Sequence, residues 1–306
     1  IESIQDNNLN TDEILADNPK TFTQLYNDIN ESQNTFEVKC DYAFSNESDS
    51  GLVVIDKSDF IINGNNHVLN GNNQSGILKI TGNNVTINNI VFVNGNSFRG
   101  GAIYASGGVT LNNVTFIANN ASRGAAIYAN GQMTLNNASF ICNNASYGGA
   151  IAYYDNILNC IHSCFNNNNA YHGGAIYSIG QLMLDNASFI GNNASYGGAI
   201  MCYDWVFGNN SRFIDNYAER GSSIYSQGAT LNVCNLFVTS NRPGKYGQIF
   251  GSISEVNIDN VDFANISSAY SPALYLEDCE SSIINSRSAG DLALVGEENF
   301  AGVEVD

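Results

Sequence analysis

Residues 100–123 read GGAIYASGGVTLNNVTFIANNASR, and residues 124–147 repeat this phrase as GAAIYANGQMTLNNASFICNNASY. Equivalent positions therefore lie 24 residues apart. The same interval, varying by one or two residues, separates the members of two columns of large apolar residues. These columns are Phe92, Phe116, Phe140, Phe165, Phe189, Phe213, Phe237 and Phe263, and Ile103, Ile127, Ile151, Ile176, Ile200, Ile224, Ile249 and Leu274. A fixed period of this length is typical of a solenoid, in which each repeat forms one coil.

Each coil carries the signals of short strands separated by bends. Apolar and polar residues alternate in phrases such as Val109-Thr110-Leu111, as they do in a strand with one buried face. Gly-Gly and Asn-Asn pairs interrupt the alternation and indicate turns. Three strands and three bends per coil predict an all-β fold, a right-handed, single-stranded parallel β-helix of about nine coils stacked about 4.8 Å apart.

An asparagine follows the phenylalanine by three positions in five consecutive coils. These residues are Asn119, Asn143, Asn168, Asn192 and Asn216. Identical amides in register hydrogen bond from one coil to the next, and asparagine tolerates a left-handed backbone. We therefore expect an amide ladder at this bend, where asparagine can also accommodate a left-handed backbone.

The two ends of the chain depart from the repeat. Thr21 to Gln24 reads as a capping box, and the amphipathic stretch that follows has its apolar residues at Phe22, Leu25, Tyr26 and Ile29. We expect residues 1–50 to form an N-terminal tail and a short helix that covers the open end of the stack. Residues 51–275 are then the β-helix, with less regular first coils in 51–99, and residues 276–306 form an irregular C-terminal coil or the start of a further segment.

Charge is distributed unevenly along the 306 residues. The formal net charge is −18, yet between residues 100 and 200 the only charged side chains are Arg123, Asp155 and Asp185. Like charges stacked in register would repel each other. The acidic balance argues against nucleic-acid binding, and without a long apolar run we expect no membrane insertion. The chain begins at Ile1, which favours a mature form or a piece of a longer protein.

Seven cysteines give an odd count without a clear metal-binding pattern. Cys160, Cys202 and Cys234 occupy positions where other coils carry Leu, Ala or Val, so we expect small buried thiols. The spacing of Cys160 and Cys164 is a weak signal for a metal or a disulfide. We therefore predict no metal site and no cofactor.

The repeated motif carries a family resemblance. Gly100-Gly101-Ala102-Ile103, followed by Phe116-x-x-Asn119, resembles the repeat of chlamydial polymorphic outer-membrane proteins, and it recurs in register in five coils. The Asn-rich version with its leading cap resembles the adhesin-like surface proteins of methanogenic archaea. This resemblance implies a secreted or wall-associated adhesin without catalytic residues. It weakens near the C-terminus, where Gly221-Ser222-Ser223-Ile224 lacks the second glycine.

Two columns of planar or aromatic residues are candidate binding surfaces. The residue before each Gly-Gly position is Arg99, Arg123, Tyr147, His172, Tyr196, Arg220, Tyr246 or Tyr270. The residue after each inward Ile is Tyr104, Tyr128, Tyr177, Tyr225, Phe250 or Tyr275. Because the Ile faces inward, we expect these tyrosines to face outward as an exposed ladder. Both columns either stabilise the stack through ring and cation–π contacts or present flat faces to sugars and partner side chains.

The strongest catalytic signal comes from Asp155 and Asp204, each four positions after an inward Ile. Gly180 lies between them, so the carboxylates could be about 9–10 Å apart, near the separation of about 6.5–9.5 Å in inverting glycosidases. Trp205 follows Asp204 and could contact a sugar. No Arg, Lys or His aligns beside this pair, which disfavours the hypothesis of an active site.

The leading hypothesis is thus an extracellular adhesin at the cell surface or cell wall, monomeric, which attaches to a surface protein or glycan of another cell. Asn-x-Ser/Thr sequons such as Asn113 and Asn137 allow glycosylation of an exported chain. Two alternatives remain: a polysaccharide-active hydrolase or lyase that uses Asp155 and Asp204, and a non-binding structural stalk.

Overall fold

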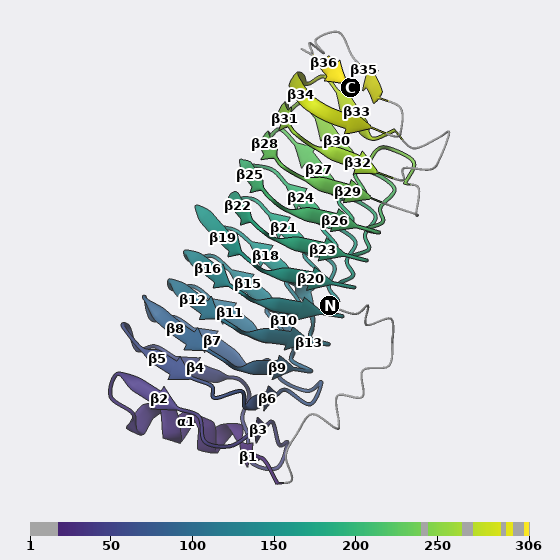
Figure 1. The fold of residues 1–306 in the computed structure, drawn as a ribbon. Coiled ribbons are helices and arrows are strands. Elements are labelled where there is room, and N and C mark those ends of the chain that lie inside the picture. The colour runs from purple at the N-terminus through teal and green to yellow at the C-terminus, as the bar shows by residue number, and fades with distance from the viewer. Residues whose placement is uncertain (1–17, 240–243, 265–271, 289–291, 296–302, 306) are drawn as a thin grey trace.

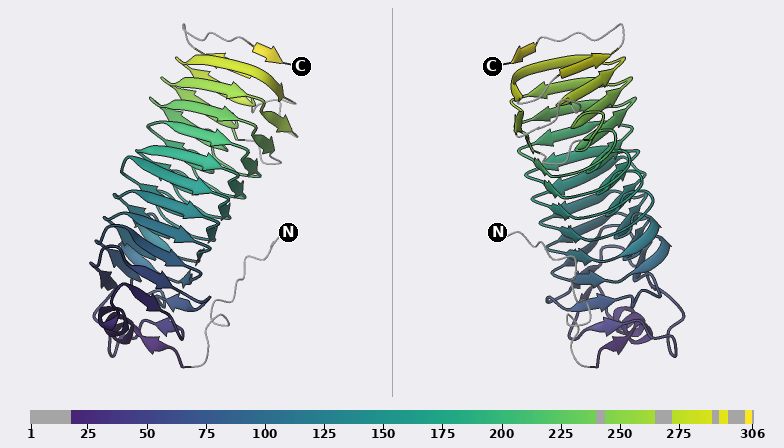
Figure 2. Two further views of the ribbon diagram at one scale, coloured as in Figure 1. Left: turned by 60° about the vertical axis from the view of Figure 1, so that its left-hand side comes forward. Right: turned by 90° about the vertical axis from the view of Figure 1, so that its right-hand side faces the viewer.

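The chain folds into a parallel β-solenoid of about 10 turns, with about 50% of its residues in strands and one short helix near the N-terminus. The structure is a computed structural model that describes residues 18–239, 244–264, 272–288, 292–295 and 303–305. The coils stack along one axis, and the helix lies across the N-terminal end (Figures 1 and 2). The predicted fold class is confirmed.

Each coil contributes one strand to each of three faces, which we name after a characteristic inward residue. The Ile face contains β4 (Val53–Ile55), β7 (Leu78–Ile80), β11 (Ile103–Ala105), β15 (Ile127–Ala129), β18 (Ile151–Tyr153), β21 (Ile176–Ser178), β24 (Ile200–Cys202), β27 (Ile224–Gln227), β30 (Ile249–Ser252), β33 (Leu274–Glu277) and β35 (Leu292–Val295). All neighbouring strands of this face pair in parallel, with Ile103 opposite Ile127 as an example.

The Leu face follows the first bend. It contains β2 (Thr35–Glu37), β5 (Ile61–Asn63), β8 (Val85–Asn88), β12 (Val109–Asn112), β16 (Met133–Asn136), β19 (Ile157–Ile161), β22 (Gln181–Asp185), β25 (Val206–Asn209), β28 (Thr230–Cys234), β31 (Glu255–Asp259), β34 (Glu280–Ser288) and β36 (Val303–Val305). Leu111 pairs with Leu135 in this face, again one repeat apart.

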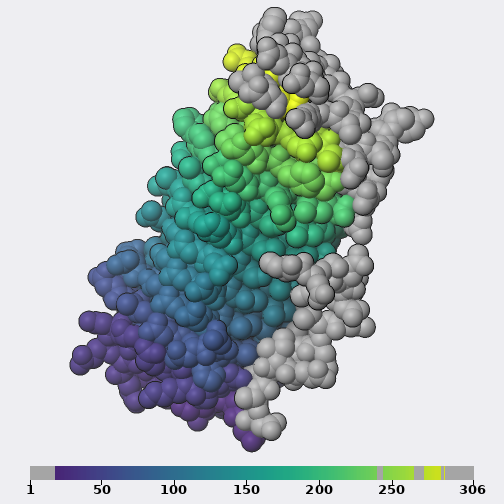
Figure 3. Space-filling view, viewed as in Figure 1, coloured from purple at the N-terminus to yellow at the C-terminus, as the bar shows by residue number. Residues whose placement is uncertain are grey.

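The Phe face completes each coil. It contains β1 (Lys20–Thr21), β3 (Tyr42–Ala43), β6 (Val68–Asn70), β9 (Val91–Val93), β13 (Thr115–Ile117), β17 (Ser139–Ile141), β20 (Cys164–Asn166), β23 (Ser188–Ile190), β26 (Arg212–Ile214), β29 (Phe237–Thr239) and β32 (Asp262–Ala264). Two further strands, β10 (Asn96–Arg99) and β14 (Asn120–Arg123), pair beside it. The result is an elongated body, whose surface is shown in Figure 3.

Phenylalanine rings form the densest column of the core. Neighbouring rings from Phe92 to Phe213 stack with centroids 4.7 to 5.0 Å apart and planes within 8° of parallel. All six rings are fully buried. Parallel, in-register pairing forces this arrangement, because it repeats the same side chain at the strand spacing.

The phase of this column changes at Phe237, where our prediction of an inward ring is wrong. The bend between β27 and β28 is one residue longer than the bend before it, since Val206 pairs with Leu231 after Ile200 pairs with Ile224. Side chains alternate along a strand, so one extra residue exchanges inward and outward positions. Val238 therefore takes the core position, and Phe237 lies half-buried on the outside.

Because of the same shift, our prediction of a buried thiol is wrong for Cys234. Cys160 and Cys202 are fully buried, and burial raises the pKa of the Cys202 thiol to about 12. Cys234 instead points outward, and its Sγ lies 3.3 Å from Asn209 Oδ1. All seven cysteines are free thiols. The two core thiols thus act as small apolar side chains.

The asparagine ladder is confirmed and lies inside the coil. Asn119 Nδ2 donates to Asn143 Oδ1 at 2.9 Å, and equivalent bonds continue through Asn168 and Asn192 to Asn216. Each of these amides also donates to a phenylalanine carbonyl, as Asn143 does to Phe116 O at 3.2 Å. The left-handed residue of this bend is not the asparagine but the residue before it, for example Ala118 with φ of 52°.

The N-terminal cap is helix α1 (Phe22–Glu31), which opens with the predicted capping box of Thr21 and Gln24. Its buried residues are Phe22, Leu25 and Ile29. Tyr26, which we expected on the apolar side, is instead 46% exposed. The helix packs on β4 and so covers the apolar end of the stack.

Polar contacts fix both ends of this helix. The Asp49 carboxylate accepts the backbone N–H groups of Phe22 at 3.0 Å and Thr23 at 2.7 Å. At the other end, Lys57 Nζ donates to Ile29 O at 2.8 Å and Asn30 O at 3.1 Å. These contacts satisfy backbone groups that have no partner within the helix.

Strand pairing also extends beyond the expected limits of the β-helix. Strand β2 pairs with β5, and β3 pairs with β6, so a partial coil lies upstream of residue 51. Strands β33 and β34 continue the parallel pairing downstream of residue 275, and β35 pairs with β33. The solenoid therefore includes parts of both predicted end segments.

Candidate functional site

The tyrosines that follow the inward Ile do not form the exposed ladder that we predicted. Tyr128, Tyr177 and Tyr225 are each less than 10% exposed, and Phe250 is 1% exposed. Burial raises the pKa of Tyr177 to about 12. Only Tyr104 and Tyr275, near the two ends, are half-buried. These side chains point away from the inner core, but a second layer of side chains covers them.

The covering layer is the other predicted column. Tyr147 lies edge-to-face on Tyr177, with centroids 5.3 Å apart, and Tyr196 contacts Tyr225 in the same way at 5.7 Å. Arg99, at the exposed end of the column, places its guanidinium 5.2 Å from the ring of Tyr128. The prediction failed because alternation along a strand fixes the direction of a side chain but not what covers it.

Members of the covering column also stack on one another. Tyr147 and His172 are 4.9 Å apart, and His172 and Tyr196 are 5.3 Å apart, with near-parallel rings. Arg123 lies over Tyr147 and Arg220 lies over Tyr246, at 5.6 and 5.1 Å. Neighbouring rings occupy the flat faces that a sugar would need, so this column fits the predicted stacking role. Tyr270 lies outside the described residues.

Two coils between Ile103 and Leu274 lack an aromatic residue after Ile, and nearby tyrosines fill the space. Where Ala152 replaces it, Tyr154 stacks on Tyr128 at 5.1 Å. Where Met201 replaces it, Tyr203 packs on Tyr177 at 5.8 Å. The phrases around Asp155 and Asp204, which we considered as catalytic, are thus explained in part by packing.

The two aspartates do not share a described pocket. Asp155 lines a polar pocket of about 600 Å³ that extends over earlier coils to Asn83 and Ser106, and Asp204 is not part of it. At the position between them, a Cβ on Gly180 would lie 1.5 Å from the carbonyl oxygen of Asp155, so the bends stack too closely for any side chain there. Within the described ranges, no group of three His, Cys, Asp or Glu side chains could hold a metal.

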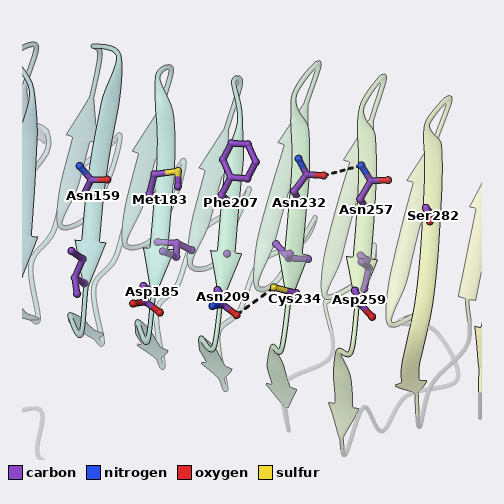
Figure 4. A pocket seen from close by; sticks show the side chains of 15 residues that line it. Asn159, Met183, Asp185, Phe207, Asn209, Asn232, Cys234, Asn257, Asp259 and Ser282 are labelled. Atoms are coloured by element: carbon purple, nitrogen blue, oxygen red, sulfur yellow. Dashed lines mark hydrogen bonds between the residues drawn. The ribbon is translucent and has the colours of Figure 1, made fainter.

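A groove on the outer Leu face is a better candidate site. It has a volume of about 620 Å³ and runs across six consecutive strands, β19, β22, β25, β28, β31 and β34. Figure 4 shows two rows of outward side chains along it. One row is Asn159, Met183, Phe207, Asn232, Asn257 and Ser282, and the other is Ile161, Asp185, Asn209, Cys234 and Asp259.

The groove begins where the repeat changes on this face. In β8, β12 and β16 the two outward positions are always Thr and Asn, and Asn136 Nδ2 donates to Asn112 Oδ1 at 2.7 Å in a continuing surface ladder. From β19 onward neither row keeps one residue type, while the inward positions stay small or apolar. The fold therefore continues while the outer surface diverges.

Apolar side chains occupy the centre of the groove. Met183 is 39% exposed, and the Phe207 ring lies 5.7 Å from that of Trp205, which is 47% exposed at the margin. Gly208 occupies an inward position in β25. The paired residue is Leu184 in β22 and Val233 in β28. These three residues form part of the floor.

Polar groups lie along the same groove. Asn257 Nδ2 donates to Asn232 Oδ1 at 2.8 Å, and Cys234 Sγ donates to Asn209 Oδ1 at 3.3 Å (Figure 4). Asn209 Oδ1 also accepts from Asn235 Nδ2 at 3.0 Å. Asp185 and Asp259 supply carboxylates, and no Lys, Arg or His lines the described groove. The groove thus combines an apolar centre, amides that both donate and accept, and negative charge.

Our sequence reasoning found Trp205 but missed the rest of this site. The signal was present, because the Thr-Leu-Asn phrase at residues 110–112 and 134–136 is missing from the next three coils and returns at residues 230–232 in a shifted register. We used the repeat to find what the coils share, and the site lies where they differ.

Comparisons with known proteins give only distant similarities. No protein-family model matches the sequence, and no curated protein matches it. The chain is similar to the solved structure of the L. reuteri 53608 SRRP, with 14% identity, a TM-score of 0.37 and coverage of 94% of this chain and 98% of that chain. It is also similar to the alginate lyase AlyF-OU02 in complex with G6, with 11% identity, a TM-score of 0.37 and coverage of 95% and 87%. Similarity at this distance indicates no function.

In the ranges that the structure describes, no helix is long and apolar enough to cross a bilayer.

Proposed function

We propose that this protein is an extracellular adhesin that attaches to a glycan or protein on another surface through the groove on its Leu face. One observation carries the proposal: at least one outward residue changes from each coil of the groove to the next, while the inward positions stay small or apolar. A purely structural stalk would not require that change, because the outward Thr and Asn rows of the earlier coils already stack and hydrogen bond from coil to coil. The resemblance to adhesin-like surface proteins of methanogenic archaea supports the same function.

The solenoid suits a binding surface physically. Its groove side chains project from strands that are hydrogen bonded on both sides, so little conformational entropy is lost on binding. Each coil adds a few contacts, and successive coils add theirs along one line. Affinity for a repetitive surface then comes from several modest contacts made together.

The enzymatic alternative has less support. It depends on Asp155 and Asp204, and the described pocket at Asp155 does not contain Asp204. The groove holds Asp185 and Asp259, which lie three strands apart, at β22 and β31. Strands stacked about 4.8 Å apart place their backbones about 14 Å apart, too far for a carboxylate pair on one glycosidic bond.

Attachment of the fluorescently labelled protein to candidate partner cells tests the proposal. The variant Met183→Thr/Phe207→Thr restores the threonine of the earlier coils, and we expect it to lose about 2 kcal/mol or more of binding free energy. Thr110→Ser, on the same face outside the groove, is the matched control and should bind like the wild type. If the double variant attaches as well as the control, the groove is not the adhesive surface.

A further inference from the structure

We infer that the ligand of this groove is an uncharged, extended glycan chain. This inference rests on the proposed function and specifies its ligand. It depends on the shape of the groove, the kind of groups that line it and the sign of its charge, which are taken in turn.

The shape of the groove fits a chain rather than a compact molecule. Its lining residues come from six successive strands, β19 to β34. Five intervals of about 4.8 Å give a track of about 24 Å along the rod. The lining positions recur at every coil although their residue types differ, so each coil can contact a successive unit of a polymer. A small ligand would occupy only one part of such a track.

The lining groups match the two sides of a sugar ring. A pyranose presents C–H groups on its faces and hydroxyls around its rim. The exposed Trp205 ring meets the half-buried Phe207 ring edge-to-face, and with Met183 beside Phe207 these side chains supply an apolar surface for such a face. The amide of Asn159 carries donors and an acceptor, and Asn209, whose Oδ1 accepts from Asn235, offers its Nδ2 donor; both suit hydroxyls that donate and accept.

Charge excludes the acidic glycans. The groove contains the carboxylate of Asp185 and no basic lining residue in its described part. A uronate polymer would bring a negative charge at each unit, one of them against this carboxylate, with no basic lining side chain to pair with the others.

The backbone of the Leu face disfavours an extended peptide. Strands such as β22 and β25 have paired neighbours on both sides, so they offer no free edge to which a peptide strand could add. A bound peptide would keep its backbone groups unpaired against Met183 and Phe207. A glycan has no such backbone, and its hydroxyls can point to the amide rows or to water.

Calorimetric titration of the intact protein tests this ligand class. The probes are hexamers of neutral β-linked glucose, mannose and galactose, a guluronate hexamer, and a lysine-rich hexapeptide. We expect at least one neutral hexamer to bind, Phe207→Thr to weaken it about tenfold, and the guluronate hexamer not to bind. Thr110→Ser is the control, and circular dichroism confirms that each variant keeps its β-helix.

Each other outcome has a defined meaning. Guluronate or peptide binding that equals or exceeds neutral glycan binding overturns the inference. The inference is also overturned if no neutral hexamer binds while Phe207→Thr still weakens attachment to cells. That result leaves the adhesin proposal intact. If cell attachment is also insensitive to Phe207→Thr, the proposed function fails together with the ligand.

Discussion

Phe140 lies in the middle of the stacked phenylalanine column, with Phe116 4.8 Å on one side and Phe165 4.7 Å on the other. Its side chain is fully buried. Phe140→Ala would remove most of the ring and leave a cavity between two rings. The hydrogen bonds of β17 to β13 and β20 fix the coil spacing, so the stack cannot collapse to fill the gap. We expect a loss of about 3–5 kcal/mol in the free energy of unfolding.

The chain provides a matched control for this substitution. Phe237 has the same place in the sequence repeat and the same residue type, but the longer bend before β28 turns it outward. Phe237→Ala should therefore cost less than about 1 kcal/mol. Denaturant unfolding followed by circular dichroism, with tests for intermediates, measures both variants. Equal losses at the two positions, or a loss below about 1 kcal/mol at Phe140, would refute the assignment of inward and outward faces.

Two further predictions concern pH. Burial raises the pKa of Asp49, but hydrogen bonds from the backbone N–H groups of Ser45, Thr23 and Phe22 lower the pKa by more than burial raises it. The pKa of Asp49 is therefore below its ordinary value. The carboxylate therefore contributes stability above the unfolded pKa of about 3.9, and this stability is lost as pH falls through the folded pKa. Asp49→Asn should lower the free energy of unfolding by about 1 kcal/mol at pH 7 and by nearly nothing near pH 2, as measured by denaturant unfolding. Burial lowers the pKa of His172, so its neutral form is favoured in the fold, and stability should fall below pH of about 6.5. His172→Tyr, which copies Tyr147 and Tyr196 of the adjacent coils, should remove that part of the acid sensitivity. If the wild type and this variant lose the same unfolding free energy between pH 7.5 and pH 5, the prediction is wrong.

Much of the fold was predictable because stacking constrains what each coil can carry. The 24-residue period identifies the coil, and the Ile, Phe and Asn columns identify groups that must meet their own copies in the next coil. The capping box of Thr21 and Gln24 is a local signal, and helix α1 begins there as predicted.

The candidate site was less predictable, because it depends on differences between coils rather than on the repeat. Replacing the Thr and Asn rows by residues such as Met183 and Phe207 changes the volume and chemistry of a surface only when neighbouring coils change as well. Reading one coil at a time, against a consensus, identifies each substitution but not the groove that six strands form together.

By itself, the sequence determined that this chain is a parallel β-solenoid with a helical cap, since in-register strands leave a direct record as a period of identical residues. Only the tertiary structure decided which outward residues reach solvent. Tyr177 and Tyr225 point outward but are buried, because Tyr147 and Tyr196 from nearby bends lie over them. Phe237 keeps its place in the repeat and still faces outward, because a single extra residue in a bend reverses the alternation that follows. Exposure depends on how separate coils pack, and that packing is not a property of any one repeat.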